Sequence, residues 1–148
     1  MSRARRNARR CAVQGLYQWQ MTGQDVSLIE QQFVAEHDLS KTDIDYFKDL
    51  LHGVPLHLHE LDDHMIPLLD RSIEMVDPVE RAILRLGVYE LEFRLDIPYR
   101  VVINEGVELA KTFGAEHGHK YVNSILDGIA RKLRAVEVKA RQQPQVNP

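Results

Sequence analysis

The sequence has a single cysteine, Cys11, and no run of eighteen apolar residues. A lone thiol cannot form a disulfide within the chain, and a membrane-spanning helix needs a long apolar run. The sequence also lacks a glycine-rich phosphate-binding loop and shows almost none of the apolar–polar alternation of strands. These absences argue against secretion and membrane insertion, so a reducing cytoplasm is the expected location.

Apolar residues instead recur every three or four positions, which predicts amphipathic helices along most of the chain. The pattern predicts about six to seven of them, in one compact all-α domain over residues 1–141 without internal repeats. A tail over residues 142–148 has no periodicity and is expected to be disordered. The predicted helices cover residues 3–21, a short segment from Ser27, 44–68, 78–93, 102–113 and 122–136.

Several residues predict where these helices begin and end. Asp77 followed by Pro78 is a strong start signal, because it combines a capping acid with a proline at the first helical position. Ser27, with Glu30 three residues later, resembles a capping box. Gly23 and Gly114 are expected stops. Pro55 should kink the long apolar stretch 44–68, which is either one helix or two in line.

Charge is distributed unevenly along the sequence. Residues 25–96 contain 17 acidic and 6 basic residues, whereas the two flanks together contain 13 basic and 5 acidic residues. Such polarity can guide an anionic partner to one surface and a different partner to another, although solvated helix faces can also differ in charge. Basic amphipathic starts also occur in transit peptides, but no linker follows here. The first ten residues hold five arginines: Arg3, Arg5, Arg6, Arg9 and Arg10.

The opening helix presents its two aromatic residues in opposite directions. At 100° per residue, Trp19 falls in the middle of the apolar arc, and Tyr17 falls on the arginine face. Arg5 and Arg9 flank the apolar arc. Arginines that bind phosphates beside a ring that can stack on a base are typical of single-stranded RNA binding. A basic face can equally serve an acidic protein or a lipid, so spacing alone leaves these partners open.

Four segments resemble the NusB family of bacterial transcription antitermination factors: ARRCAVQGLYQWQ, AILRLGVYEL, IPYRVVINEGVELAKTFGAE and HKYVNSILDGIA. The resemblance runs in order from about Arg5 to Arg134. It implies two small helical bundles packed across each other. It also implies binding to boxA RNA together with the ribosomal protein NusE. That pair joins the antitermination complex on RNA polymerase and suppresses premature termination, chiefly in ribosomal RNA operons.

The resemblance also assigns residues to two surfaces. One is an RNA surface made of the five arginines, Tyr17 and the start of the last helix. There Lys120, Tyr121 and Asn123 offer a cation, a ring and an amide that can read base edges. The NusE surface lies on the acidic middle helices, with Glu74, Glu80 and Tyr89 as candidates. His117 stands where the family usually has an acid, and Pro55 interrupts a helix that is usually continuous.

Catalytic and metal sites are not expected from the sequence. His59 and His64 are five residues apart, whereas the zinc-binding helix motif needs two histidines four apart. Glu60, Asp63 and His64 could converge, but a solvated polar face is the expected arrangement. Cys11 has no partner base and falls on the apolar side of its helix. The remaining alternative to RNA binding is a helical scaffold that binds only protein, or a homodimer that hides the arginine face.

Overall fold

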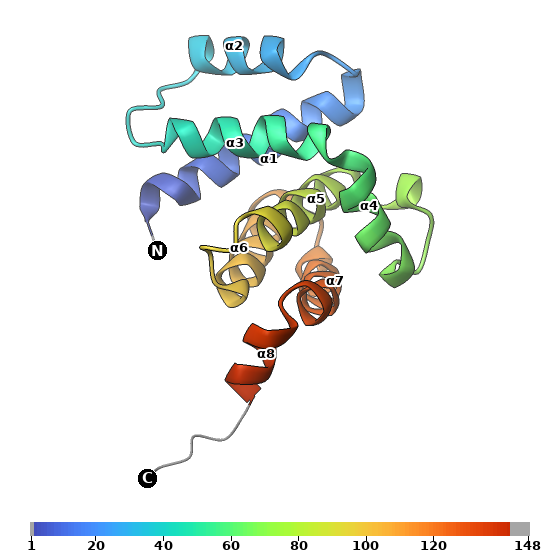
Figure 1. The fold of residues 1–148 in the computed structure, drawn as a ribbon. Coiled ribbons are helices and arrows are strands. Elements are labelled where there is room, and N and C mark those ends of the chain that lie inside the picture. The colour runs from blue at the N-terminus through green and yellow to red at the C-terminus, as the bar shows by residue number, and fades with distance from the viewer. Residues whose placement is uncertain (1, 143–148) are drawn as a thin grey trace.

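The computed structural model describes residues 2–142, and within this range the chain is all-helical, without strands (Figure 1). The all-α prediction is therefore confirmed, although the helices number eight rather than six to seven, besides two short 3₁₀ helices. Their bounds are α1 Arg3–Thr22, α2 Val26–Glu36, α3 Ile44–Leu56, α4 Leu58–Met65, η1 Ile66–Leu68, η2 Ile73–Met75, α5 Pro78–Phe93, α6 Tyr99–Phe113, α7 Gly118–Leu133 and α8 Ala135–Gln142.

The helices form two groups that cross each other. Helices α1, α2 and α3 pack together, and α5, α6 and α7 form the second group. Figure 1 shows α1 and α3 running across the page, while α7 is seen nearly end-on. Because α1 packs against α5 as well as α3, it joins the two groups, and the residues between them form one continuous core.

Helix α5 lies at the centre of this core, as its apolar sequence predicts. All residues from Ala82 to Leu91 are buried, including the charged Arg85 and Glu90. Asp77 caps the helix as expected, because its Oδ1 accepts hydrogen bonds from the backbone N–H groups of Val79 at 2.9 Å and Glu80 at 3.2 Å. The helix can therefore begin at Pro78 even though it is surrounded by other elements.

Two helix breaks account for the extra helices. Pro55 stands one residue before the end of α3, and α4 then leaves in a new direction rather than in line (Figure 1). The second break is at Arg134, where a single helix over 122–136 had been expected. Arg134 is buried, and its guanidinium donates hydrogen bonds to the carbonyls of Glu90, Leu91, Arg94 and Ile97. Arg134 thereby holds the end of α7 against the end of α5. Val136, two residues later, lies outside the core, with 84% of its surface exposed.

The helix ends agree only in part with the predicted signals. Gly23 ends α1 in the left-handed conformation with φ of 70°, and its N–H donates to the Trp19 carbonyl at 2.9 Å. Gly114 ends α6 but with φ of −87°, so it is not a left-handed cap. Asp25, rather than Ser27, caps α2, since its Oδ1 accepts from the Ser27 N–H at 2.7 Å.

No helix within residues 2–142 is both long enough and apolar enough to cross a membrane. The predicted disordered tail largely lies outside the described residues, since only Gln142 falls within them. Gln142 is helical and belongs to α8.

Candidate nucleic-acid interface

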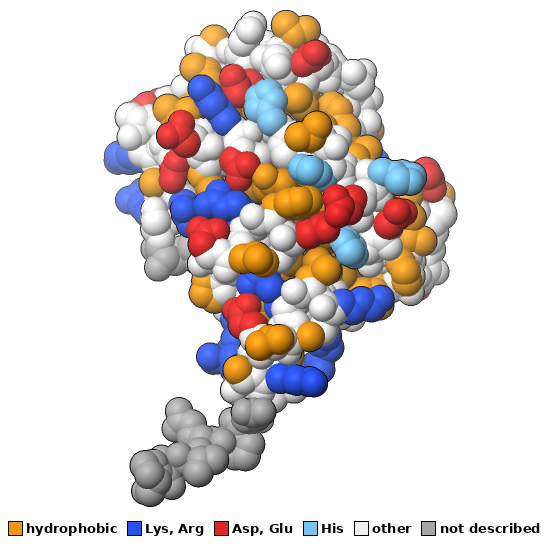
Figure 2. Space-filling view, in the orientation of Figure 1, with side chains coloured by type: hydrophobic (Ala, Val, Ile, Leu, Met, Phe, Trp, Pro, Cys, Tyr) orange, Lys and Arg blue, Asp and Glu red, His pale blue; other side chains and the backbone are white. Residues whose placement is uncertain are grey.

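The basic face of α1 has three exposed arginines. Ser2 starts the helix, since its Oγ accepts a hydrogen bond from the Arg5 N–H at 3.3 Å. Arg3, Arg6 and Arg10 then follow at helical spacing and surround a hollow of about 360 Å³. Figure 2 shows basic side chains beside the start of α1, at the left edge of the molecule. Three guanidinium groups around one hollow can grip phosphates with paired hydrogen bonds.

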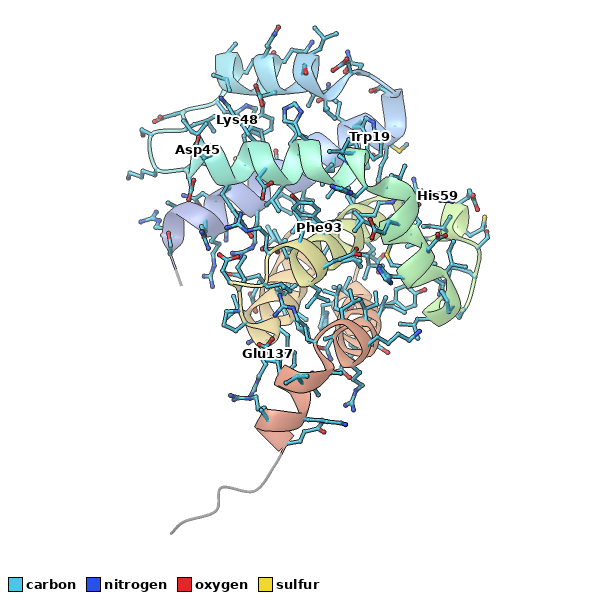
Figure 3. The ribbon with its side chains drawn as sticks, viewed as in Figure 1. Trp19, Asp45, Lys48, His59, Phe93 and Glu137 are labelled. Carbon is cyan, nitrogen blue, oxygen red and sulfur yellow. The ribbon has the colours of Figure 1, made fainter. Side chains whose placement is uncertain are left out.

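Tyr17 and Trp19 point in different directions, as the helical wheel predicts. Tyr17 has 40% of its surface exposed, whereas Trp19, near the C-terminal end of α1, packs partly buried against the core (Figure 3). Tyr17 lines a groove of about 490 Å³ between α1 and α2, together with Val79 of α5 and Phe113 of α6. The ring therefore stands at the edge of an open apolar surface, where a base could stack on it.

Arg9 is buried rather than exposed on this face, so the prediction that it contacts RNA is wrong. Its side chain is 1% exposed and forms an ion pair with Glu90, with Nη2 to Oε2 at 2.9 Å. Glu105 lies 3.7 Å away, and the Tyr46 hydroxyl donates to the same Glu90 carboxylate. Burial alone would lower the pKa of Arg9, but the Glu90 carboxylate holds it above its ordinary value. Arg9 thus joins α1 to α5 inside the core.

Arg5 and Arg6 are partly engaged by acidic neighbours. The Arg5 guanidinium lies 4.7 Å from the Tyr46 ring centroid, and its nitrogens approach Asp43 at 3.9 Å and Asp96 at 3.8 Å. The Arg6 Nε donates to Glu105 at 3.2 Å, although about half of the Arg6 side chain is exposed. RNA phosphates would compete with these carboxylates for Arg5 and Arg6. Both arginines therefore offer a weaker phosphate contact than a fully solvated arginine would.

Lys41 lies beside the basic face of α1, although the sequence pattern does not place it there. Asn7 donates from Nδ2 to the Lys41 carbonyl at 2.9 Å, which holds the loop between α2 and α3 beside α1. A second hollow of about 330 Å³ is lined by Arg10 and by this loop, including Lys41. Lys41 stands in the acidic part of the sequence, 31 positions after Arg10, so no local pattern could have assigned it to the basic face.

The start of α7 offers exposed polar side chains. Lys120 and Asn123 are exposed, whereas Tyr121 is half-buried, and its hydroxyl donates to Asp70 at 3.2 Å. Arg71 stacks on the Tyr121 ring at 5.0 Å, and burial together with Asp70 raises the pKa of the Tyr121 hydroxyl. His117 precedes the helix with φ of 69° and is exposed.

Tyr17 and the start of α7 both lie beside the start of α5. Val79 lines the Tyr17 groove, and the next residue, Glu80, lies against Gly118 at the start of α7. The arginines Arg3 and Arg6 lie farther off, since fourteen residues of helix separate Arg3 from Tyr17 by about 21 Å. An RNA strand that contacted both predicted RNA segments would therefore run along α1 before it reached α7.

Of the three residues predicted to contact a protein partner, only Glu74 is exposed. Glu80 is 8% exposed, and burial, followed by the neighbouring Asp77, raises its pKa. Tyr89 is 6% exposed, packs on Gly53 and donates its hydroxyl to Asp49 at 2.7 Å. Both side chains therefore pack within the fold, and their prediction as direct surface contacts is corrected. The acidic pattern alone could not separate buried from exposed positions.

Comparison with known proteins agrees with this geometry. The sequence model described as the NusB family matches residues 6–131. The transcription antitermination protein NusB of Alcanivorax borkumensis is 57% identical over 139 residues, covering 94% of this chain and 93% of that protein. Its counterpart in Nitrosococcus oceani is 57% identical over 141 residues, covering 95% of each.

Solved structures of NusB proteins also match this chain, at lower sequence identity. NusB of T. maritima superposes with a TM-score of 0.78 at 32% identity, covering 94% of this chain and 99% of that one. A chain from a crystal structure of the antitermination factors NusB and NusE in complex with double-stranded RNA also gives a TM-score of 0.78. It is 31% identical and covers 88% of this chain and 98% of its own length.

Proposed function

The chain belongs to the NusB family of transcription antitermination proteins, and on this premise we propose that it binds single-stranded boxA RNA together with the ribosomal protein NusE. The pair then joins the antitermination complex on elongating RNA polymerase, in the cytoplasm, and suppresses premature termination, chiefly in ribosomal RNA operons. The family consists of transcription factors without enzymatic activity, so the chain is not an enzyme.

The observation that carries the proposal is the exposed face of α1. Arg3, Arg6 and Arg10 surround one hollow, and Tyr17 is exposed farther along the same helix. Guanidinium groups supply the phosphate contacts, and one stacked base contributes about 1–3 kcal/mol of binding free energy. Lys41 adds a further cation beside Arg10.

Helix α7 supplies the second half of the proposed RNA surface. Lys120 adds a phosphate contact, and Asn123 can read a base edge because an amide offers both a donor and an acceptor. Tyr121 takes part only if its ring is released from Asp70 and Arg71, so we assign it a secondary role. The related complex of NusB with NusE contains RNA, which supports placing RNA on this fold.

For NusE we propose the acidic middle of the chain, with Glu74 as the exposed contact. Ribosomal proteins are basic, and opposite charges raise the rate of encounter. Glu80 and Tyr89 are buried, so they would contribute to this face by packing beneath it. Glu74→Lys should therefore weaken NusE binding and leave the affinity of the free protein for RNA unchanged.

The test is a titration of labelled boxA RNA, with and without NusE, against the full chain. Arg10→Ala should weaken binding, whereas the matched control Lys139→Ala, on the exposed side of α8, should bind like the unchanged protein. If a triple alanine variant at Arg3, Arg6 and Arg10 folds and still binds RNA normally, the proposal is wrong. Light scattering of the free protein tests the homodimer in which the arginine face is hidden.

A further inference from the structure

Three potential metal ligands converge where α4 crosses the end of α5. The side-chain ligand atoms of Glu60, His64 and Glu92 all lie within 4.8 Å of one another. His64 Nε2 and Glu92 Oε1 are 3.2 Å apart. Figure 2 shows histidine and acidic side chains gathered over this part of the molecule.

The two histidines whose spacing does not fit the zinc-binding helix motif, His59 and His64, are not both part of this cluster. His59 is five positions from His64 and stands on the outer side of α4, with 99% of its side chain exposed (Figure 3). Glu60 and His64 are four positions apart, so they share one face of α4. That face packs against α5, and Glu92 comes from there, 28 positions after His64.

Two polar atoms in this cluster have no hydrogen-bond partner in the described part of the chain. His64 Nε2 and Glu92 Oε2 are buried and accept or donate no hydrogen bond among the described residues. The 3.2 Å approach of the ring nitrogen to the carboxylate therefore lacks hydrogen-bond geometry. Buried polar atoms without hydrogen-bond partners are destabilising. A cation held by both groups would remove this penalty.

The surroundings also favour a cation. The ligand oxygens of Glu60 and Glu92 lie within 4.8 Å of each other, and two like charges this close repel each other unless a counter-charge lies between them. His57 places Nδ1 3.7 Å from Glu60 Oε2 and stacks on Phe93, which fixes its ring. The cluster opens into a hollow of about 510 Å³ whose lining contains neither lysine nor arginine.

We propose that Glu60, His64 and Glu92 form a binding site for a divalent transition-metal ion of the zinc type. Zinc binds imidazole nitrogen and carboxylate oxygen at about 2.0–2.2 Å, so two neighbouring ligands of a tetrahedral ion lie about 3.4 Å apart. The separation between His64 and Glu92 already fits this value. A mixed nitrogen and oxygen set favours zinc, nickel or copper over magnesium and calcium, which prefer oxygen alone. The ion would fasten α4 to α5.

The experiment uses the full chain without an affinity tag, freed of metal by dialysis against a chelator. Calorimetric titration with zinc chloride should show one ion bound per chain, and saturating zinc should raise the melting temperature. His64→Gln and Glu92→Gln should each weaken binding at least tenfold and abolish the rise. His59→Gln is the matched control, because it removes an exposed histidine of the same helix and should bind zinc unchanged.

A second readout identifies the ligands directly. Cobalt(II) bound in place of zinc should give visible absorption that disappears in His64→Gln and persists in His59→Gln. Glu60 is exposed, so Glu60→Gln provides a further variant if either buried substitution prevents folding. The proposal is overturned if the unchanged protein binds no zinc. It is equally overturned if the folded cluster variants bind zinc with unchanged affinity, since the ion would then lie elsewhere.

Discussion

Replacing Arg9 with methionine should destabilise the fold without removing a contact to RNA. Arg9 and Glu90 are each 1% exposed, so the substitution leaves the Glu90 carboxylate buried without its guanidinium partner. Removing one member of a buried ion pair typically costs about 3–5 kcal/mol. We expect the lower end of that range, because Tyr46 still donates to Glu90 and Arg6 still pairs with Glu105.

For a chain of this size, a loss of about 3 kcal/mol corresponds to a fall in melting temperature of roughly 6–12 °C. Thermal and urea unfolding monitored by circular dichroism would measure it. The matched control is Arg10→Met, one position along the same helix, which should change stability by less than about 0.5 kcal/mol because Arg10 is exposed. RNA titration at a temperature where both variants are folded should give the reverse order, with affinity lost only in Arg10→Met.

The double variant Arg9→Met with Glu90→Gln tests the cause of the loss. It should recover part of the stability, since it removes the lone buried charge together with its partner. If Arg9→Met instead melts like the unchanged protein and loses RNA affinity, then Arg9 faces the solvent and the packing of α1 described above is wrong.

Three further predictions concern the RNA surface and the start of α5. Tyr17→Ala should leave the melting temperature nearly unchanged and cost about 1–3 kcal/mol of RNA affinity. Trp19→Ala should instead lower stability, by less than the roughly 3–5 kcal/mol typical of a fully buried ring. If Tyr17→Ala destabilised the fold and Trp19→Ala weakened only RNA binding, α1 would face the other way. RNA affinity should fall with salt at a log–log slope near −3, about −0.7 for each of roughly four phosphate contacts, and a flat response would contradict the role of the arginines. The pKa of the Glu80 carboxyl group is raised in the folded protein, so the folded state binds a proton at Glu80 more tightly than the unfolded state does. The free energy of unfolding therefore falls as the pH rises from the unfolded pKa of Glu80 through its folded pKa. Glu80→Gln should therefore melt at a higher temperature than the unchanged protein at neutral pH, and the difference should shrink toward about pH 4, where both side chains are uncharged; a difference that grows on acidification would refute this assignment.

Much of the fold follows from local pattern. A helix places residues three and four apart on one side, so apolar spacing alone predicts α1, the opposite directions of Tyr17 and Trp19, and the central helix that begins after Asp77. Pro55 likewise marks the end of α3, because it cannot donate a helical hydrogen bond. These features depend on residues that are close together in the sequence, and the sequence therefore determined them.

Contacts between distant residues decided the rest. Arg9 belongs to the core only because Glu90 and Glu105 reach it from α5 and α6, 81 and 96 positions later. Arg134 ends α7 because the carbonyls at the end of α5 lie beside it, and Glu92 reaches His64 because α4 packs on α5. A charged residue has the same helical periodicity whether it meets solvent or a buried partner. Which of these it meets depends on how the helices pack, and only the tertiary structure could determine that.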